Sequence, residues 1–178
     1  MPIRAAALSD VEALSDLAAR TFPLAAPDDA APDSLDDFIA QNLSAARFTE
    51  YVTDPACDVL VHDDEGGLGG YVLLVTEEPA DPDVVAALSL SPTIMLSKFY
   101  VDPAAHGSGL AASLMLDAFS AAEARGVAGM WLGVNQENER AHRFYEKQGF
   151  QRVGTKRFQV GARLEHDFVY ERPVRAAR

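Results

Sequence analysis

The chain is short of cysteine, of long apolar runs and of positive charge. Its one cysteine, Cys57, excludes an internal disulfide and argues against a zinc site built on cysteine. No run of about 18 apolar residues occurs that would span a membrane. Residues 1–6 contain no apolar stretch long enough for a signal peptide. We therefore expect a soluble, cytoplasmic protein with no membrane partner and no metal.

Lysine and arginine number 15 against 27 aspartates and glutamates, which gives a formal net charge of −12. A nucleic-acid partner needs a basic face that displaces counterions from phosphates, so we expect no nucleic acid to bind. The acidic balance is compatible with a cationic substrate. Acidic surfaces also serve solubility, however, and the charge alone does not specify a ligand.

The composition is that of a globular domain, with 48% hydrophobic and 24% charged residues. The 10 prolines and 12 glycines are spread along the chain, and no segment has the composition of a linker. We predict a single domain over residues 1–173, followed by a disordered tail at 174–178.

Apolar periodicity predicts an α/β fold. Ser9 and Glu12 are spaced as a capping box for the first helix, and Pro23 is expected to end it. Helices are predicted near residues 10–22, 34–43, 44–53, 84–88, 110–125 and 138–148. Strands are predicted at 2–6, 58–62, 70–75, 94–101, 130–134, 150–157 and 165–172. The segment from Ile94 to Val134 should form a right-handed strand–helix–strand crossover with parallel strands. The fold is thus a mixed, largely antiparallel central sheet with this parallel crossover and flanking helices.

A glycine turn follows the apolar strand at 94–101 and precedes the helix at 110–125. It reads His106-Gly107-Ser108-Gly109-Leu110-Ala111. Glycines let backbone N–H groups converge there, and the helix adds the positive end of its dipole, so the turn is suited to a phosphate. A dinucleotide fingerprint would also fit G-x-G-x-x-A, but it requires an acid after the next strand. That strand ends Gly133-Val134-Asn135, which disfavours the dinucleotide alternative.

A second motif lies in the helix at 138–148. Asn138 and Tyr145 are seven residues apart, so they lie on one helix face with Ala141 between them. Packing of Tyr145 and Phe144 between helix and sheet is the alternative to a functional role.

The turn and the helix together resemble the GNAT acyltransferase superfamily, with its loop Q/R-x-x-G-x-G/A and its tail signature N-x-x-A-x-x-x-Y-x-x-x-G-F. His106 departs from the usual Gln or Arg at the first loop position. The resemblance implies the GNAT fold and acetyl-CoA (coenzyme A) as co-substrate. It implies cofactor-binding positions at Phe99, Tyr100, Val101, His106, Gly107, Ser108, Gly109, Leu110, Ala111, Asn138 and Tyr145.

The reaction of an amine with a thioester needs alignment, donors to oxygen and a proton for the departing sulfur. The resemblance places the Tyr145 hydroxyl near that sulfur, and we predict Tyr145 as the catalytic general acid. No general base can be selected among the many carboxylates.

The predicted function is an acetyl-CoA-dependent N-acetyltransferase that modifies a primary amine of a small molecule by direct attack in a ternary complex. Segments such as Lys98-Phe99-Tyr100-Val101 are similar to PaiA-type spermidine/spermine N-acetyltransferases, so a polyamine is one candidate acceptor. Two alternatives stay open: a non-catalytic acyl-CoA-binding sensor or interaction module, and a protein N-terminal or lysine acetyltransferase. A homodimer is compatible with the sequence.

Overall fold

The computed structural model of the protein describes residues 2–160 and 162–174. The predicted single domain at 1–173 stays a prediction. The predicted tail lies outside the described residues except for Val174, which is buried and donates its N–H to the carbonyl of Ala128 at 2.9 Å.

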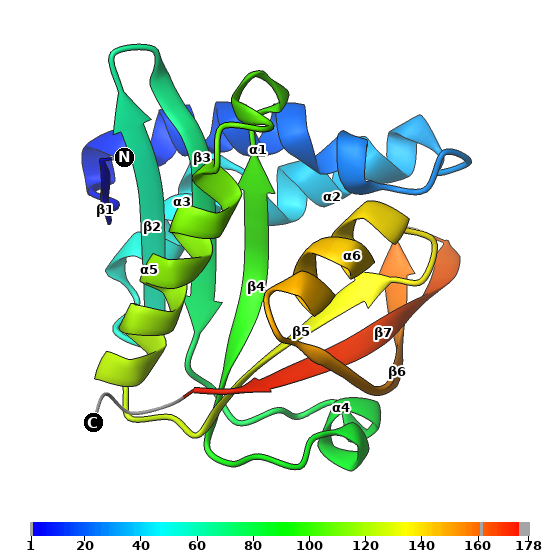
Figure 1. The fold of residues 1–178 in the computed structure, drawn as a ribbon. Helices are drawn as coiled ribbons and strands as arrows, with labels where there is room; N and C mark the ends of the chain where they lie inside the picture. Colours follow the sequence, from blue (N-terminus) through cyan, green and yellow to red (C-terminus); the bar gives the residue numbers. More distant parts are fainter. Residues whose placement is uncertain (1, 161, 175–178) are drawn as a thin grey trace.

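Strands of the described residues form one sheet in the order β1-β2-β3-β4-β5-β7-β6 (Figure 1). All neighbours are antiparallel except β4 and β5, which are parallel. The predicted mixed α/β fold with one parallel crossover is therefore confirmed. The strands are β1 (Ile3–Ala5), β2 (Cys57–Asp64), β3 (Gly67–Val75), β4 (Thr93–Val101), β5 (Gly129–Asn135), β6 (Gln151–Val160) and β7 (Arg163–Pro173).

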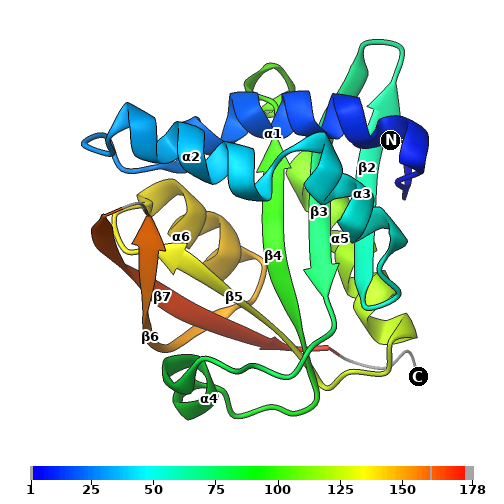
Figure 2. The same cartoon turned by 180° about the vertical axis from the view of Figure 1, so that it is seen from behind.

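Helices cover both faces of the sheet. In Figure 1 α5 and α6 lie in front of it, and Figure 2 shows α1, α2 and α3 across the opposite face. The helices are α1 (Val11–Ala25), α2 (Pro32–Asn42), α3 (Ala45–Thr53), α4 (Pro82–Ala87), α5 (Leu110–Ala124) and α6 (Glu139–Lys147). Within the part of the chain that the structure describes, no helix has the length and apolarity needed to cross a membrane.

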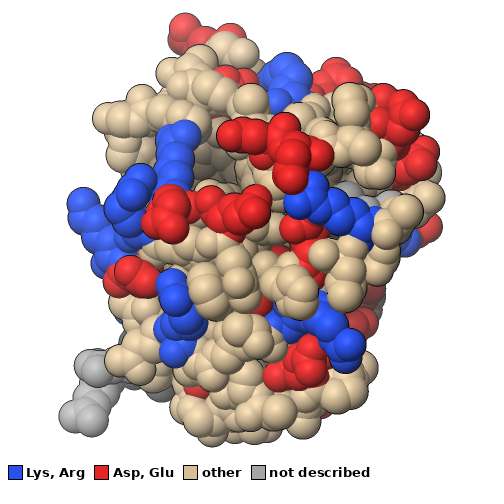
Figure 3. All heavy atoms as spheres, turned by 90° about the vertical axis from the view of Figure 1, so that its right-hand side faces the viewer, with Lys and Arg blue, Asp and Glu red and all other residues tan. Residues whose placement is uncertain are grey.

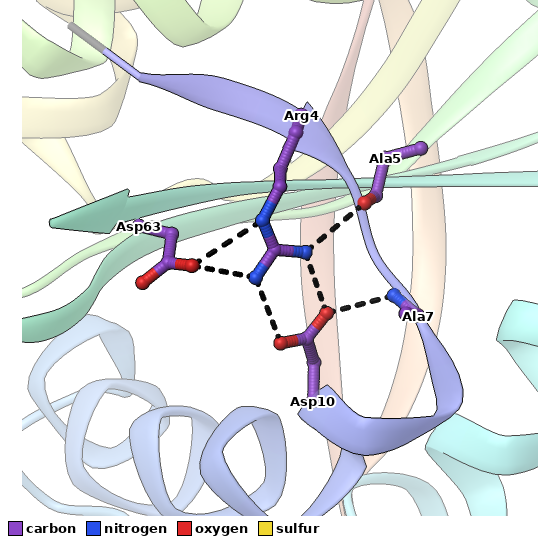
Figure 4. Close-up of polar contacts among 5 residues, drawn as sticks. All are labelled: Arg4, Ala5, Ala7, Asp10 and Asp63. Atoms are coloured by element: carbon purple, nitrogen blue, oxygen red, sulfur yellow. Dashed lines mark hydrogen bonds and ion pairs between the residues drawn. The ribbon is translucent and has the colours of Figure 1, made fainter.

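The start of α1 differs from the predicted capping box. A short 3-10 helix at Leu8–Asp10 precedes it, and the Asp10 carboxylate accepts the N–H of Ala7 at 2.7 Å. The same carboxylate binds the Arg4 guanidinium through contacts of 2.7 and 3.0 Å, and Arg4 also pairs with Asp63 of β2 (Figure 4). The prediction that Ser9 and Glu12 cap this helix is wrong, because Asp10 binds an upstream N–H and an arginine instead.

The end of α1 also differs from the prediction, because the helix includes Pro23 and continues to Ala25. Proline lacks an N–H and therefore removes one helical hydrogen bond. In the last turn this loss is small, since few residues follow. The extension brings Ala25 beside the carboxyl half of β4.

The parallel pair β4–β5 is joined over a short length. Its register runs only from Thr93 opposite Gly129 to Met95 opposite Trp131. Beyond that point the two strands diverge and α6 lies in front of the gap (Figure 1). A β-bulge at Ser97, where the register with β3 shifts, coincides with the divergence. The facing edges of β4 and β5 past this point thus have no strand partner across the gap.

Candidate functional site

Two cavities meet where β4 and β5 separate. The first, here the α6 cavity, has a volume of about 270 Å³ and lies between these strands and α6. The second, the α2 cavity, has a volume of about 410 Å³ and is lined by residues from α1, α2, β4, β5, β6 and β7. Both cavities share Ala25, Ser97, Tyr100, Gly133, Val134 and Asn138. Two molecules could therefore approach each other at the split in the sheet.

Most of the predicted site residues lie together in the α6 cavity. Its lining includes Phe99, Tyr100, Val101, His106, Ala111, Asn138 and Tyr145. The predicted positions 107–110 form the turn that leads from this cavity into α5. The structure thus joins the two sequence motifs into one site, although they are separated by the whole of α5 and β5.

The turn takes its shape from two glycines with positive φ, Gly107 at 79° and Gly109 at 85°. L-residues rarely adopt such angles, which explains glycine at both positions. Ser108 donates its hydroxyl to the carbonyl of Ala105 at 2.5 Å and accepts the N–H of Leu110 at 3.3 Å. The Leu110 side chain belongs to the hydrophobic core, so this residue joins the turn to the body of the protein.

Backbone N–H groups at the turn are available to a ligand. Among the hydrogen bonds of the described residues, none uses the N–H of Gly107, Gly109, Ala111 or Ala112. These groups stand at the N-terminus of the 15-residue helix α5, where the helix dipole favours negative charge. The turn therefore fits the diphosphate of a nucleotide-type cofactor.

His106, which stands where the loop motif usually has Gln or Arg, contacts Arg140, a residue that the sequence did not single out. A guanidinium nitrogen of Arg140 lies 2.9 Å from His106 Nδ1, and His106 Nε2 lies 3.2 Å from the carbonyl of Val101. Arginine can only donate, so Nδ1 accepts and Nε2 carries the proton that is donated to Val101. This contact holds a cationic group from α6 at the loop position where the sequence itself supplies only a histidine.

Tyr145 lies in the wall of the α6 cavity and is 9% exposed. Its ring packs edge-on against Phe99 and Phe150, with centroids 6.4 and 5.8 Å away. Its hydroxyl makes no hydrogen bond with any described residue. Burial, with a smaller contribution from Tyr100, raises the pKa of this phenol well above its ordinary value. Tyr145 is therefore a neutral donor without a partner, in addition to being a packing residue.

Other polar residues of α6 hold the helix in place. Asn138 caps it, since its side-chain oxygen accepts the N–H of Ala141 at 3.1 Å and leaves the amide NH₂ free for another partner. His142 is buried, with Nε2 3.0 Å from the carbonyl of Gln136 and Nδ1 2.9 Å from the Tyr170 hydroxyl. These bonds link α6 to β7 and fix the position of Tyr145.

The α2 cavity contains charged groups of both signs, which sequence reasoning did not select. Its charged lining residues are Asp29, Lys98, Lys156, Arg163, Glu165 and Asp167. Figure 3 shows the end of the molecule that carries α6 and the tips of β6 and β7, where acidic and basic side chains are interspersed. The cavity therefore does not have the uniformly acidic wall that the net charge of the chain would suggest.

Asp167 and Lys156 lie together at the junction of the cavities. A Cβ on Gly133 would lie 3.3 Å from the Asp167 Oδ2 atom and 3.3 Å from the Cδ and Cε atoms of Lys156, so both side chains lie against β5 at a residue common to both cavities. Asp167 is 7% exposed, and burial raises the pKa of its carboxyl. Burial and the nearby Asp167 together raise the pKa of Tyr100 to about 12. Nothing in the sequence indicated that Asp167 lies at this junction, because its position depends on β5 and β7 being neighbouring strands.

No group of three or more His, Cys, Asp or Glu residues that could hold a metal ion occurs at positions 2–160 and 162–174.

Comparison with known proteins matches residues 11–150 to the model of the Acetyltransferase (GNAT) family. An uncharacterized N-acetyltransferase of Mycobacterium tuberculosis is 42% identical over 167 residues, which cover 94% of this chain and 99% of that protein. The fold is similar to the PaiA N-acetyltransferase of Thermoplasma acidophilum, solved with coenzyme A, with a TM-score of 0.76, 18% identity and coverage of 97% and 98% of the two chains. The ribosomal-protein-S18-alanine N-acetyltransferase of Escherichia coli gives a TM-score of 0.69 at 20% identity, over 99% and 96% of the chains. The chain belongs to the GNAT family of acetyltransferases and is an acyltransferase that uses acetyl-CoA.

Proposed function

We propose that the protein transfers the acetyl group of acetyl-CoA to a primary amine of a small molecule, by direct attack in a ternary complex. The observation that carries this proposal is the junction of two cavities at the β4–β5 split. One cavity ends in an anion-binding turn, the other contains buried charges, and the unpaired Tyr145 hydroxyl lies in the wall of the first.

The α6 cavity and its turn would hold the donor, which supplies an activated acetyl thioester. The free N–H groups of Gly107, Gly109 and Ala111 suit the diphosphate, with Arg140 as a nearby cation. The unpaired edge of β4 from Phe99 to Val101 offers backbone groups to the amides of the pantetheine arm.

Two residues at the junction would move protons. As the amine nitrogen bonds to the acetyl carbon and the carbon–sulfur bond breaks, Tyr145 donates its proton to the departing sulfur. Asp167 accepts the proton that the amine releases, and its raised pKa makes it a better base than an ordinary aspartate. Exchange with solvent then restores both groups.

The identity of the acceptor amine is proposed from likeness to other acetyltransferases. A likeness of fold to the PaiA enzyme supports a polyamine as one candidate. The likeness to a ribosomal-protein alanine acetyltransferase supports a protein N-terminus as the alternative, and a non-catalytic acyl-CoA sensor is the third possibility. A cytoplasmic location and a homodimer stay predictions.

The test is release of free thiol from acetyl-CoA in the presence of polyamines, amino acids, aminoglycosides and peptides. Release that depends on an added small amine supports the proposal. Binding of acetyl-CoA with no release for any acceptor would favour the sensor, and release with peptides alone would favour the protein acetyltransferase.

Tyr145→Phe tests the proton donor. General acid catalysis contributes about 10²–10⁴-fold, so kcat should fall about 100-fold or more while the affinity for acetyl-CoA, measured by calorimetry, changes little. Tyr71→Phe is the matched control, because it removes a buried hydroxyl that has no hydrogen-bond partner among the described residues, and Tyr71 lines neither cavity. A Tyr145→Phe enzyme as active as this control would remove Tyr145 from the mechanism.

A further inference from the structure

We infer that Lys98 binds an anionic group of the acceptor, so that the preferred acceptor is an amine that also carries a carboxylate, as an amino acid does. This inference rests on the proposed N-acetyltransferase function and names the substrate class of the same site.

Lys98 lies in β4 opposite Leu73 of β3, and its side chain lines the α2 cavity. It is partly buried, yet it forms no hydrogen bond or ion pair with any described residue; its Nζ atom lies 5.6 Å from the centroid of the Tyr51 ring. Burial, with a smaller contribution from Arg47, lowers the pKa of this ammonium to about 8, so it is mostly charged at neutral pH. An ammonium withdrawn from water without a counter-ion is costly, which makes an anion in the cavity a favourable partner.

A second cation, Arg47 of α3, lies close to Lys98 but outside the lining of the cavity. The Arg47 guanidinium lies 5.1 Å from the centroid of the same Tyr51 ring, and its carboxylate partner, Glu50, is on the exposed side of α3. The Tyr51 hydroxyl donates to the carbonyl of Asn42, a residue of the cavity wall, at 3.1 Å. Tyr51 thus lies close to the charged ends of both Lys98 and Arg47. Glu50 compensates the charge of Arg47, whereas Lys98 has no ion-pair partner among the described residues.

None of the acidic residues that line the cavity forms a hydrogen bond or ion pair with Lys98. Arg163 contacts Asp29 at 2.8 Å and Glu165 at 2.6 Å, and Asp167 lies with Lys156 against Gly133 at the junction with the α6 cavity. An amine placed for attack would therefore meet Asp167, while a carboxylate of the same molecule would meet Lys98. A polyamine would instead bring a further ammonium toward a lysine that no carboxylate neutralises.

Part of the cavity wall is apolar. Phe22 and Phe38 stack with their ring centroids 4.5 Å apart, and Leu35 and Met95 also line the cavity. Such a wall suits the carbon skeleton that joins an amine to a carboxylate.

The test compares compounds that differ only in the anionic group. Free thiol release is measured with amino acids of small, aliphatic and aromatic side chain, with their amides and with the corresponding decarboxylated amines. We expect kcat/KM to be at least tenfold higher for the carboxylates. Lys98→Met should reduce this ratio to about one and Lys98→Arg should retain it. Lys147→Met, which removes an exposed lysine of α6 outside the α2 cavity, is the control.

The affinity of the protein for the acetylated products can be measured without turnover. N-acetylated amino acids and their amides are titrated by calorimetry into protein saturated with coenzyme A. Tighter binding of the acids that is lost in Lys98→Met supports the inference, provided thermal melting shows the variant folded. Equal affinity for acids and amides, including no binding of either, would overturn it. Failure to bind acetyl-CoA at all would instead reject the proposed function.

Discussion

Replacing Gly109 with valine should weaken acetyl-CoA binding far more than the same change at Gly126. The two glycines lie at opposite ends of α5, with φ of 85° and 71°, and a Cβ on either would meet no atom within 4 Å. Valine therefore introduces a similar backbone strain at both sites without a clash inside the protein. Only Gly109 lies in the anion-binding turn, so the difference between the variants isolates that role.

The magnitudes follow from the geometry. Holding an L-residue in the left-handed region costs about 1–2 kcal/mol, which lowers the Tm of a domain of this size by about 2–8 °C in both variants. At Gly109 the new side chain would also stand in the turn that carries the free N–H groups. Charge-assisted hydrogen bonds contribute about 1.5–3 kcal/mol each, so the loss of one or two should raise the Kd for acetyl-CoA about 100-fold.

Calorimetry with acetyl-CoA and thermal melting on both variants provide the measurement. We expect equal losses of Tm and unequal losses of affinity. If Gly109→Val and Gly126→Val bind acetyl-CoA equally well, the turn does not hold the cofactor.

Further predictions concern the base and the fold. Asp167→Asn should lower kcat about 100-fold and remove the acid limb of the pH–rate profile, which in the parent enzyme should begin above the ordinary aspartate pKa of about 3.9, because burial raises the pKa of this group. An unchanged profile would exclude Asp167 as the base. Asp10→Asn should destabilise the protein by about 2 kcal/mol, seen in urea denaturation, because Arg4 and the Ala7 N–H lose a charged acceptor. The Arg4 guanidinium holds the pKa of Asp10 below its usual value, so this stabilisation is complete above the unfolded pKa and is lost as the pH falls through the folded one. Equal acid sensitivity of parent and variant would contradict this assignment.

The sequence predicted the elements well where the local signal was strong. The helix at 110–125 and the strand at 94–101 differ from α5 and β4 by one residue each at one end. The errors arose where a tertiary contact competed with a local rule. Asp10 binds Arg4 of a neighbouring strand instead of leaving the cap to Ser9, and α1 passes through Pro23.

The site residues follow the same rule: positions set by local sequence could be predicted, and positions set by tertiary packing could not. The turn at 106–111 and the face of Asn138 and Tyr145 could be predicted because each is a contiguous motif whose geometry is set locally. Asp167 and Lys98 could not, since their position in the α2 cavity depends on the order of the strands and on the divergence of β4 and β5. The pairing of Arg140 with His106 likewise requires the docking of α6 against the turn.

The short pairing of β4 with β5 divides the sheet into two panels, β1 to β4 and β5-β7-β6. Near their joined end, Glu171 of β7 accepts the N–H groups of Ser89 and Leu90 at 3.0 and 2.9 Å. A molecule that bonds to both free strand edges would hold the two panels together and would stabilise the protein against opening by RT ln(1 + [L]/Kd). The free energy needed to separate the panels should therefore rise with the logarithm of the substrate concentration once this exceeds Kd.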